Sequence, residues 1–385
     1  MLRLLLLSLC LLGCLSLAAQ PISLHPDNPH YLAYQGAPIL LSTSAEHYGA
    51  VLNQDFDYSL YLQTLEEAGM NYTRIFSGSY VEIPSSFGIN NNTLSPAVGK
   101  YLTPWQRVEE PGLYEGEGKF DFDQWNPAYF ARLKAFLTEA AERGIIVELT
   151  FFCATYQDAS WERHPFNPAN NVNYDDSLAR HDFNTRRYPQ AFAYQKALVH
   201  KLVTELNEFD NLFYELSNEP WSDGNVDERF LLKTLRPQAQ GMNWALWVES
   251  PTPERMAWQK ALAAVVAETE QNLPQKHLVA QNFTNFSHSL PEVDPNISIL
   301  NFHYAWPEAV SMNYGWDRPI NFDESGFAGR ADTTYLHQAW AFILAGGAVF
   351  NNLDYSFAVG EETGTDTSAA PGGGSARLRS QLAFL

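Results

Sequence analysis

The chain has 385 residues, of which 44 are acidic and 24 are basic, so its formal net charge at neutral pH is −20. This excess of negative charge argues against binding to nucleic acids or anionic membranes, because neutralising phosphates needs clustered Lys and Arg. Hydrophobic residues make up 45% of the chain and aromatic residues 14%, which excludes a disordered protein. The length suits two ordinary domains or one large α/β barrel.

Residues 1–19 are predicted to form a signal peptide. Arg3 precedes an apolar run that is too short to span a membrane, and the small residues Ala18 and Ala19 follow it. We therefore expect a secreted protein, extracellular or periplasmic, without an integral membrane span. A second interpretation stays open, because Leu11 to Cys14 resembles a bacterial lipobox, which would leave a lipid anchor on Cys14.

Cysteine and histidine usage gives no sign of a metal site. Beyond the leader the chain keeps only Cys153, which rules out an internal disulfide and which we expect to be a small buried hydrophobic residue. The ten histidines are scattered, and neither a His-Glu-x-x-His motif nor a pair of cysteines occurs. We therefore predict neither a metal nor a cofactor.

Residues 20–385 alternate between apolar strand-like runs and amphipathic helical runs. This alternation indicates βα units around a parallel sheet, and eight strands fit a (β/α)8 barrel in one catalytic domain. The predicted strands are Ile39–Ser44, Asn71–Phe76, Ile145–Phe151, Leu212–Leu216, His277–Gln281, Ile297–Phe302, Ile320–Phe322 and Ala348–Leu353. The predicted helices are Phe56–Gly69, Pro127–Gly144, Gln190–Phe209, Glu254–Leu273 and Thr333–Gly346. A short helical run, Ala376–Leu385, ends without a capping residue, so the last helix is expected to be truncated. Residues 21–38 are expected to form a small hairpin.

Three of the connections that follow strands are long, at about residues 77–125, 154–188 and 221–253. Barrel enzymes carry their active sites on such loops. The loops are rich in aromatic residues, so we expect a long aromatic-lined groove for an extended substrate, with two or three rings at the substrate and the rest packed. The rings concerned include Trp105, Tyr114, Trp161, Trp221, Trp244 and Trp247.

Two acidic motifs follow predicted strands. Asn218-Glu219-Pro220 ends the fourth strand, and Asp323-Glu324 ends the seventh. The pair resembles the fourth- and seventh-strand motifs of the retaining glycoside hydrolases of clan A, which include the family 5 cellulases and mannanases. The resemblance covers about residues 39–357 and implies that Glu219 is the acid/base and Glu324 the nucleophile, acting on a carbohydrate.

The chemistry is consistent with this interpretation. Retention needs two carboxyl groups ~5–5.5 Å apart, whereas inversion needs ~6.5–9.5 Å. Repulsion between two close carboxylates raises the pKa of one of them, which we expect to be the acid. Asp323 competes with Glu324 as nucleophile, but strand alternation places only one of the two in the barrel mouth, and the motif favours Glu324.

The resemblance also implies substrate-binding residues. Arg74 is similar to the arginine that hydrogen-bonds the nucleophile, and the alternative role for Arg74 is a structural ion pair. Asn218 is similar to the residue that binds the sugar 2-hydroxyl. His303 and Tyr304 match the His/Tyr position beside the nucleophile, and the sequence leaves open which of the two faces inward. The other candidates are His47, Trp221, Asp354 and Tyr355. Asp354 and Tyr355 stand where many family 5 enzymes carry a tryptophan that serves as a platform for the sugar. This departure leaves the identity of the sugar open.

The sequence also bears on three other functions. A carbohydrate-binding pseudo-enzyme would keep the groove without chemistry, but both carboxylates are present. A serine esterase needs Gly-x-Ser-x-Gly, which the chain lacks. A metal-dependent barrel hydrolase is expected to carry a His-x-His motif after the first strand, but the chain has Glu46-His47-Tyr48 there. The sequence leaves open the linkage, internal or terminal attack, and the oligomeric state.

Overall fold

A computed structural model describes residues 20–385 except 85, 115, 176, 223–225, 232–246 and 369, with the backbone alone described for 226–231. The predicted signal peptide, Cys14 and Trp244 lie outside the described residues. Among the residues described, no helix is both long enough and apolar enough to cross a lipid bilayer.

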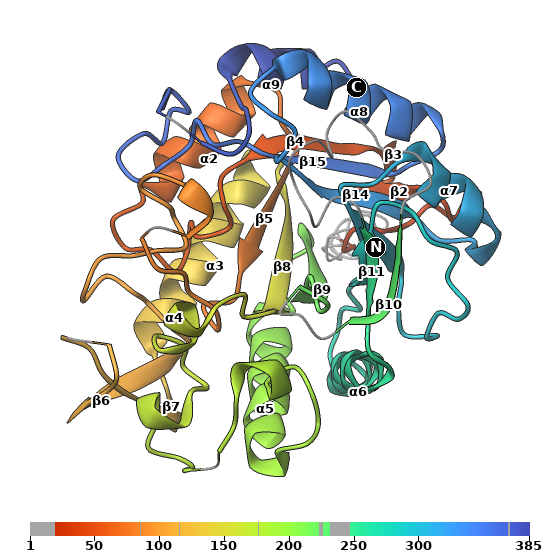
Figure 1. Ribbon diagram of the computed structural model, residues 1–385. Coiled ribbons are helices and arrows are strands. Elements are labelled where there is room, and N and C mark those ends of the chain that lie inside the picture. The colour runs from red at the N-terminus through yellow and green to blue at the C-terminus, as the bar shows by residue number, and fades with distance from the viewer. Residues whose placement is uncertain are drawn as a thin grey trace, which may run out of the picture.

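The core is an eight-stranded parallel sheet in the order β4-β15-β14-β13-β12-β9-β8-β5. The two strands at the ends of this order, β4 and β5, pack against each other, so the sheet nearly closes into a barrel (Figure 1). Every residue of these strands is buried, as expected for a parallel sheet covered on its outer face by helices. All eight predicted strands are present, and the (β/α)8 prediction is confirmed. Their bounds are β4 Leu41–Ala45, β5 Tyr72–Phe76, β8 Ile146–Cys153, β9 Leu212–Asn218, β12 Val279–Asn285, β13 Ile299–His303, β14 Ile320–Ser325 and β15 Val349–Leu353.

The predicted helices form where local signals start and stop them. Asp57 caps the first helix by accepting hydrogen bonds from the backbone N–H groups of Ser59 and Leu60. Gly69 and Gly144 end two helices with φ of 76° and 70°, a conformation that glycine adopts without strain. The helices are α2 Tyr58–Glu67, α3 Pro127–Glu142, α5 Pro189–Leu206, α6 Pro253–Glu270, α7 Pro307–Asn313, α8 Asp332–Leu344 and α9 Ala376–Leu382.

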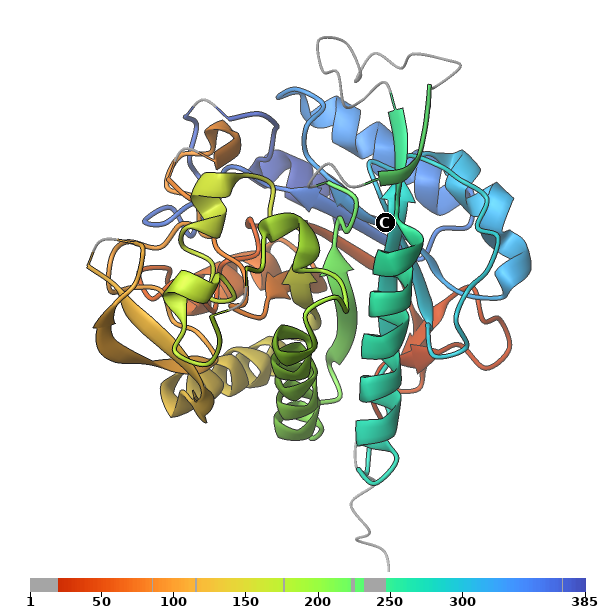
Figure 2. The same cartoon turned by 60° about the horizontal axis from the view of Figure 1, so that its bottom comes forward.

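One βα unit departs from the predicted alternation. The connection from β12 to β13, residues 286–298, is described in full and contains no helix. On the neighbouring flank α5 and α6 lie side by side (Figure 2). The outer layer is therefore incomplete beside β12.

The N-terminal segment closes the bottom of the barrel. It forms a three-stranded antiparallel sheet from β1 (Ser23–Leu24), β2 (Leu32–Tyr34) and β3 (Ala37–Ile39), one strand more than the predicted hairpin. Its apolar side chains join a cluster with the first residues of the barrel strands, including Phe213 and Val349. The Ile22 N–H also bonds to the Asp210 carbonyl oxygen at 2.9 Å.

The three long connections carry extra elements at the other end of the barrel. After β5 comes an antiparallel hairpin of β6 (Trp105–Pro111) and β7 (Gly118–Trp125), and after β8 the short helix α4 (Asp158–Trp161). After β9, β10 (Val226–Leu231) pairs with β11 (Trp247–Pro251). These insertions surround the carboxyl ends of the strands, where the predicted site residues lie.

Candidate active site

A cavity of about 260 Å³ opens at the carboxyl ends of the barrel strands. It contains both predicted catalytic carboxylates. Its residues come from the ends of six of the eight strands and from the loops that follow them, so most of the barrel mouth contributes to it. They are His47, Tyr48, Phe76, Glu82, Phe87, Leu94, Cys153, Tyr156, Asn218, Glu219, Ser222, Glu249, Tyr304, Glu324 and Phe327.

Glu219 and Glu324 face each other in this cavity. They are 7% and 5% exposed, and one oxygen of each carboxylate lies within 4.8 Å of the other. An upper limit of 4.8 Å between these two oxygens is compatible with the ~5–5.5 Å between the carboxyl groups of retaining glycosidases. The geometry therefore suits a double displacement.

The backbone at the strand ends is strained. Tyr48, Glu219 and Tyr304 each come within a few residues of a barrel strand's end and have φ of 65°, 40° and 50°. A non-glycine residue in this left-handed region costs on the order of 1–3 kcal/mol, and such residues gather at functional sites. Here the strained backbone turns three polar side chains toward the same point.

Glu219 is held by three donors. His303 Nδ1 lies 2.9 Å from its Oε1, and the hydroxyls of Tyr156 and Ser222 donate to Oε2 at 2.9 and 2.8 Å. Burial raises the pKa of Glu219, but the hydrogen bond and positive charge of His303, with the two hydroxyls, outweigh it and leave this pKa below its usual value. Glu219 is thus held as an anion beside an imidazolium.

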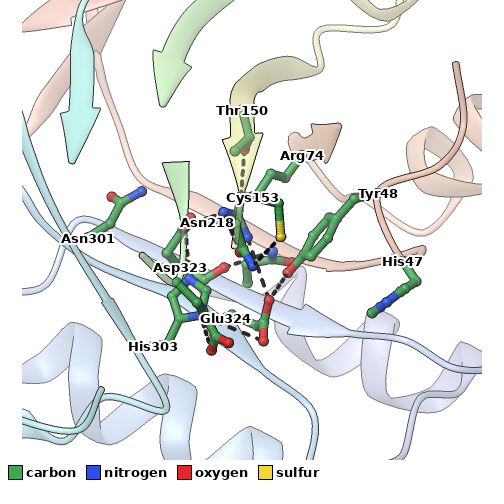
Figure 3. A network of polar contacts seen from close by, with 12 residues as sticks. His47, Tyr48, Arg74, Thr150, Cys153, Asn218, Asn301, His303, Asp323 and Glu324 are labelled. Atoms are coloured by element: carbon green, nitrogen blue, oxygen red, sulfur yellow. Dashed lines mark hydrogen bonds and ion pairs between the residues drawn. The ribbon is translucent and has the colours of Figure 1, made fainter. Parts of the chain in front are cut away.

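Glu324 is bound by two tyrosines. Tyr48 donates to Oε2 at 2.8 Å (Figure 3). Tyr304 donates to Oε1 at 2.5 Å. Burial raises its pKa, His303 opposes this, and the negative charge of Glu219 adds to it, so the net shift is upward. The sequence interpretation placed the raised pKa on the acid, Glu219. In the structure the two shifts are reversed, because His303 bonds to Glu219 and only approaches Glu324, at 3.7 Å.

His303 connects this pair to charges deeper in the barrel. Its Nε2 lies 3.5 Å from Asp323 Oδ2, directly beneath the catalytic layer. Burial lowers the pKa of His303, but Glu324, Asp323 and Glu219 together raise it to about 10. His303 is therefore an imidazolium near neutral pH, and with Glu219 it shares a proton across a 2.9 Å hydrogen bond.

Arg74 belongs mainly to this buried layer. Its guanidinium donates a hydrogen bond to Glu215, and its Nη2 lies 3.4 Å from Asp323 Oδ2. Its Nη1 lies 3.6 Å from Glu324 Oε2, which is beyond hydrogen-bond distance. Arg74 is thus both a structural ion-pair partner and a source of positive charge for Glu324. Asp323 points into this layer and Glu324 into the cavity, as strand alternation requires.

The donor set favours proton chemistry over metal binding. Glu215, His303 and Asp323 offer ligand atoms within 4.8 Å of one another, and so do Glu219, His303 and Glu324. Both sets depend on His303, which must be neutral to bind a metal. In the first set the Arg74 guanidinium already provides the cation.

The other predicted substrate residues separate into three groups. His47 and Asn218 line the cavity. Trp221 is 2% exposed and lies behind the site, with its ring edge-on to His303 at 6.0 Å. Tyr355 also lies behind the wall, with its ring 6.0 Å from that of Phe327.

Asp354 was expected at the substrate, and the structure corrects this. Its Oδ2 bonds to Arg379 of α9 at 2.6 Å and to the Ser44 hydroxyl at 2.8 Å, and the residue is 2% exposed. Two of the loop rings pack, as expected for most of them. The loop rings Trp105 and Trp161 are buried in packing clusters, and the rings of the cavity wall are those of other residues, including Phe87 and Phe327.

Several cavity residues were not predicted. Tyr48, Glu82 and Tyr156 stand in loops where the sequence has no regular spacing to mark them. One signal was available for Tyr48 and Tyr156, since each lies a few residues after a predicted strand, where barrel enzymes place functional side chains. Glu82 lies further along its loop and had no such signal.

Comparison with known proteins supports the fold. No protein-family model and no curated protein matches the chain in sequence. In structure, a β-mannanase from the blue mussel Mytilus edulis matches at TM-score 0.54 and 12% identity, over 92% of this chain and 99% of that one. A family 5 mannosidase from Rhizomucor miehei matches at TM-score 0.56 and 10% identity, over 94% and 97%.

A protein from Bacteroides vulgatus, provisionally assigned as a glycoside hydrolase, matches at TM-score 0.57 and 15% identity. The match covers 88% of this chain, which spans only 55% of that protein. The chain thus has the barrel fold found in family 5 glycoside hydrolases.

Proposed function

We propose that this protein is a retaining glycoside hydrolase, with Glu219 as acid/base and Glu324 as nucleophile. The observation that carries the proposal is the pair of buried carboxylates, from β9 and β14, whose oxygens come within 4.8 Å at the base of one cavity. The fold of family 5 enzymes supports it, because their chemistry uses the same two positions in the barrel. The proposed reaction requires no cofactor.

In the first step a Glu324 oxygen bonds to the anomeric carbon while the bond from that carbon to the leaving oxygen breaks. The leaving oxygen takes a proton from Glu219, which receives it from His303 Nδ1 along their hydrogen bond. In the second step water attacks the anomeric carbon, Glu219 takes its proton and returns it to His303 Nδ1, and the Glu324 ester bond breaks. Tyr48 and Tyr304 stabilise the returning carboxylate.

The cavity favours a neutral sugar. Four carboxylate side chains line it, those of Glu82, Glu219, Glu249 and Glu324, and an anionic sugar would be repelled by them. Two of the structural neighbours are described as acting on mannose-containing substrates. We therefore propose β-mannosides and β-glucosides as the first substrates to test.

Product stereochemistry tests both roles. With a 2,4-dinitrophenyl β-glycoside, which needs no acid assistance, azide should rescue each alanine variant. In Glu324→Ala, azide takes the place of the carboxylate and gives an inverted glycosyl azide. In Glu219→Ala, it attacks the glycosyl-enzyme from the other face and gives a retained one. The pKa shifts alone favour the opposite assignment, with Glu324 as acid/base and Glu219 as nucleophile. That assignment would be established if Glu324→Ala gave the retained azide and Glu219→Ala the inverted one.

The matched control is Glu270→Gln, a buried glutamate bonded to His277 at 2.6 Å outside the cavity. We expect this variant to keep turnover, whereas Glu219→Ala and Glu324→Ala lose it by ~10²–10⁴-fold or more on unactivated substrates. Sugar binding without hydrolysis by the wild-type protein would instead support the pseudo-enzyme.

We also propose that the protein is exported and that residues 1–19 are removed. Intact mass and N-terminal sequencing of the mature protein test this. A free N-terminus near Gln20 in the soluble fraction is expected. If the protein is instead found in the detergent phase with a lipid on Cys14, it is anchored to a membrane and not secreted in free form.

A further inference from the structure

Four of the aromatic rings that line the cavity form a continuous series, here called the aromatic collar: Tyr156, Phe87, Phe327 and Tyr304. Successive ring centroids are 5.1, 6.3 and 6.1 Å apart, so neighbouring rings are in contact. The two ends of the collar bond to the two carboxylates, Tyr156 to Glu219 and Tyr304 to Glu324. The collar therefore runs without a break from one catalytic residue to the other.

Phe87 completes the collar at the cost of backbone strain. It has φ of 56°, is 41% exposed, and contacts Phe327 from the loop after β14. Two loops on separate strands thus meet through their rings. The ring contact narrows this side of the cavity.

A polar pair lies inside the same wall, formed by His47 and Glu82. The Nε2 of His47 is 3.4 Å from Glu82 Oε1, and both side chains are nearly fully buried. Tyr80 and Asn92 also donate to Glu82, at 3.2 and 2.5 Å. A carboxylate has about four acceptor sites, so the described partners leave one for a ligand.

His47 offers the complementary donor in its protonated form. Burial lowers the pKa of His47, but the neighbouring carboxylates, Glu82 first among them, outweigh this and raise the pKa, which favours an imidazolium with an N–H on both ring nitrogens. Its Nδ1 has no hydrogen-bond partner among the residues that the structure describes, although the side chain is 9% exposed and lines the cavity. A free acceptor next to a free donor matches two neighbouring sugar hydroxyls. The proposed catalytic chemistry uses neither group.

The cavity has room for little more than one sugar. Its volume of about 260 Å³ is below the ~300–1,000 Å³ of clefts that hold drug-sized ligands. A chain that ran through the site would need a longer groove, which is what the long loops suggested. The cavity formed by the described residues is not such a groove.

We infer that the enzyme acts at chain ends: the pocket takes one terminal, neutral glycosyl residue, and His47 with Glu82 binds the pair of hydroxyls farthest from the cleaved bond. This inference rests on the proposed glycosidase function and makes Glu82 a specificity-determining residue. The polymer beyond the cleaved bond leaves through the open side of the cavity.

Blocked substrates test the inference. The probes are 4-nitrophenyl β-1,4-mannotrioside and the corresponding glucotrioside, each with the terminal 4- and 6-hydroxyls either free or closed in a benzylidene acetal. We expect single sugars to be released from a free trioside and no cleavage of its blocked form. Cleavage of both forms at similar rates would overturn terminal attack and leave the glycosidase function intact. No cleavage of any trioside, or of the dinitrophenyl glycosides, would contradict the proposed function, and the inference with it.

Glu82→Gln tests the recognition pair. On the free trioside we expect kcat/KM to fall about ten- to a hundred-fold, the loss of one hydrogen bond to a charged acceptor. The azide-rescue products should keep their stereochemistry, since the catalytic pair is intact. Glu270→Gln changes an equally buried Glu–His pair and should leave kcat/KM unchanged. An unchanged kcat/KM in a folded Glu82→Gln variant would exclude this role for Glu82.

Discussion

Asp323 lies beneath His303, with its Oδ2 3.5 Å from Nε2, while the other ring nitrogen of His303 bonds to Glu219 at 2.9 Å. The imidazole thus joins a buried carboxylate to the proposed acid/base. Burial raises the pKa of Asp323, but Arg74 and His303 outweigh it and keep this pKa well below its usual value. A permanent negative charge therefore lies under the imidazolium.

Asp323→Asn should move the alkaline limb of the pH–activity profile. Removing this charge takes away one of the groups that raise the pKa of His303, so the proton shared with Glu219 is lost at lower pH. An opposite charge at this distance shifts a pKa by ~1–3, so the limb should fall by at least ~1 pH unit. The measurement is kcat/KM from pH 4 to 10. A profile that drops uniformly in height without moving would show a structural role only.

Tyr304→Phe should move the opposite limb. Tyr304 donates to Glu324 and lowers its pKa, so removing the hydroxyl raises this pKa further, and Glu324 stays protonated to higher pH. Activity should then appear at higher pH, and kcat should fall about 10–100-fold, as for the loss of a hydrogen bond to a charged group. Tyr48→Phe should act in the same direction. An acid limb that stays in place in both variants would contradict this account of Glu324.

Trp221 is expected to orient His303 and not to hold sugar. Its buried ring lies edge-on to the imidazole and is absent from the described cavity wall. Trp221→Phe should preserve most activity, whereas Trp221→Ala should lower kcat with little change in KM. Steady-state kinetics on the free triosides separate the two roles. A rise in KM at constant kcat would show that the ring binds substrate directly.

Arg379→Met should destabilise the fold and spare substrate recognition. The buried pair of Arg379 and Asp354 is 2.6 Å apart with side chains 1% and 0% exposed, and removing one partner leaves an uncompensated charge. Such changes cost about 3–5 kcal/mol. Urea unfolding measures the loss, and the double variant with Asp354→Leu should recover part of it. A stable Arg379→Met variant with a changed sugar preference would show that Asp354 takes part in substrate binding after all.

The sequence predicted the barrel well because buried parallel strands are continuous apolar runs, and all eight were recognisable. Glu219 and Glu324 were recognisable because each ends such a run. His303 was also predicted to lie beside them, but its contacts with Glu219 and Asp323 were not, since they depend on distances between strands that spacing along the chain does not encode. The same limit explains Asp354, whose partner Arg379 lies 25 residues further on in α9.

The sheet that closes the bottom of the barrel has a consequence for the order of assembly. Its strands come first in the chain, yet they dock on Phe213 and Val349, which are synthesised much later. Contacts this distant in sequence form late in folding. The three-stranded sheet at the bottom of the barrel is therefore expected to dock last, and residues 23–39 stay undocked until the strands that carry Phe213 and Val349 have been synthesised.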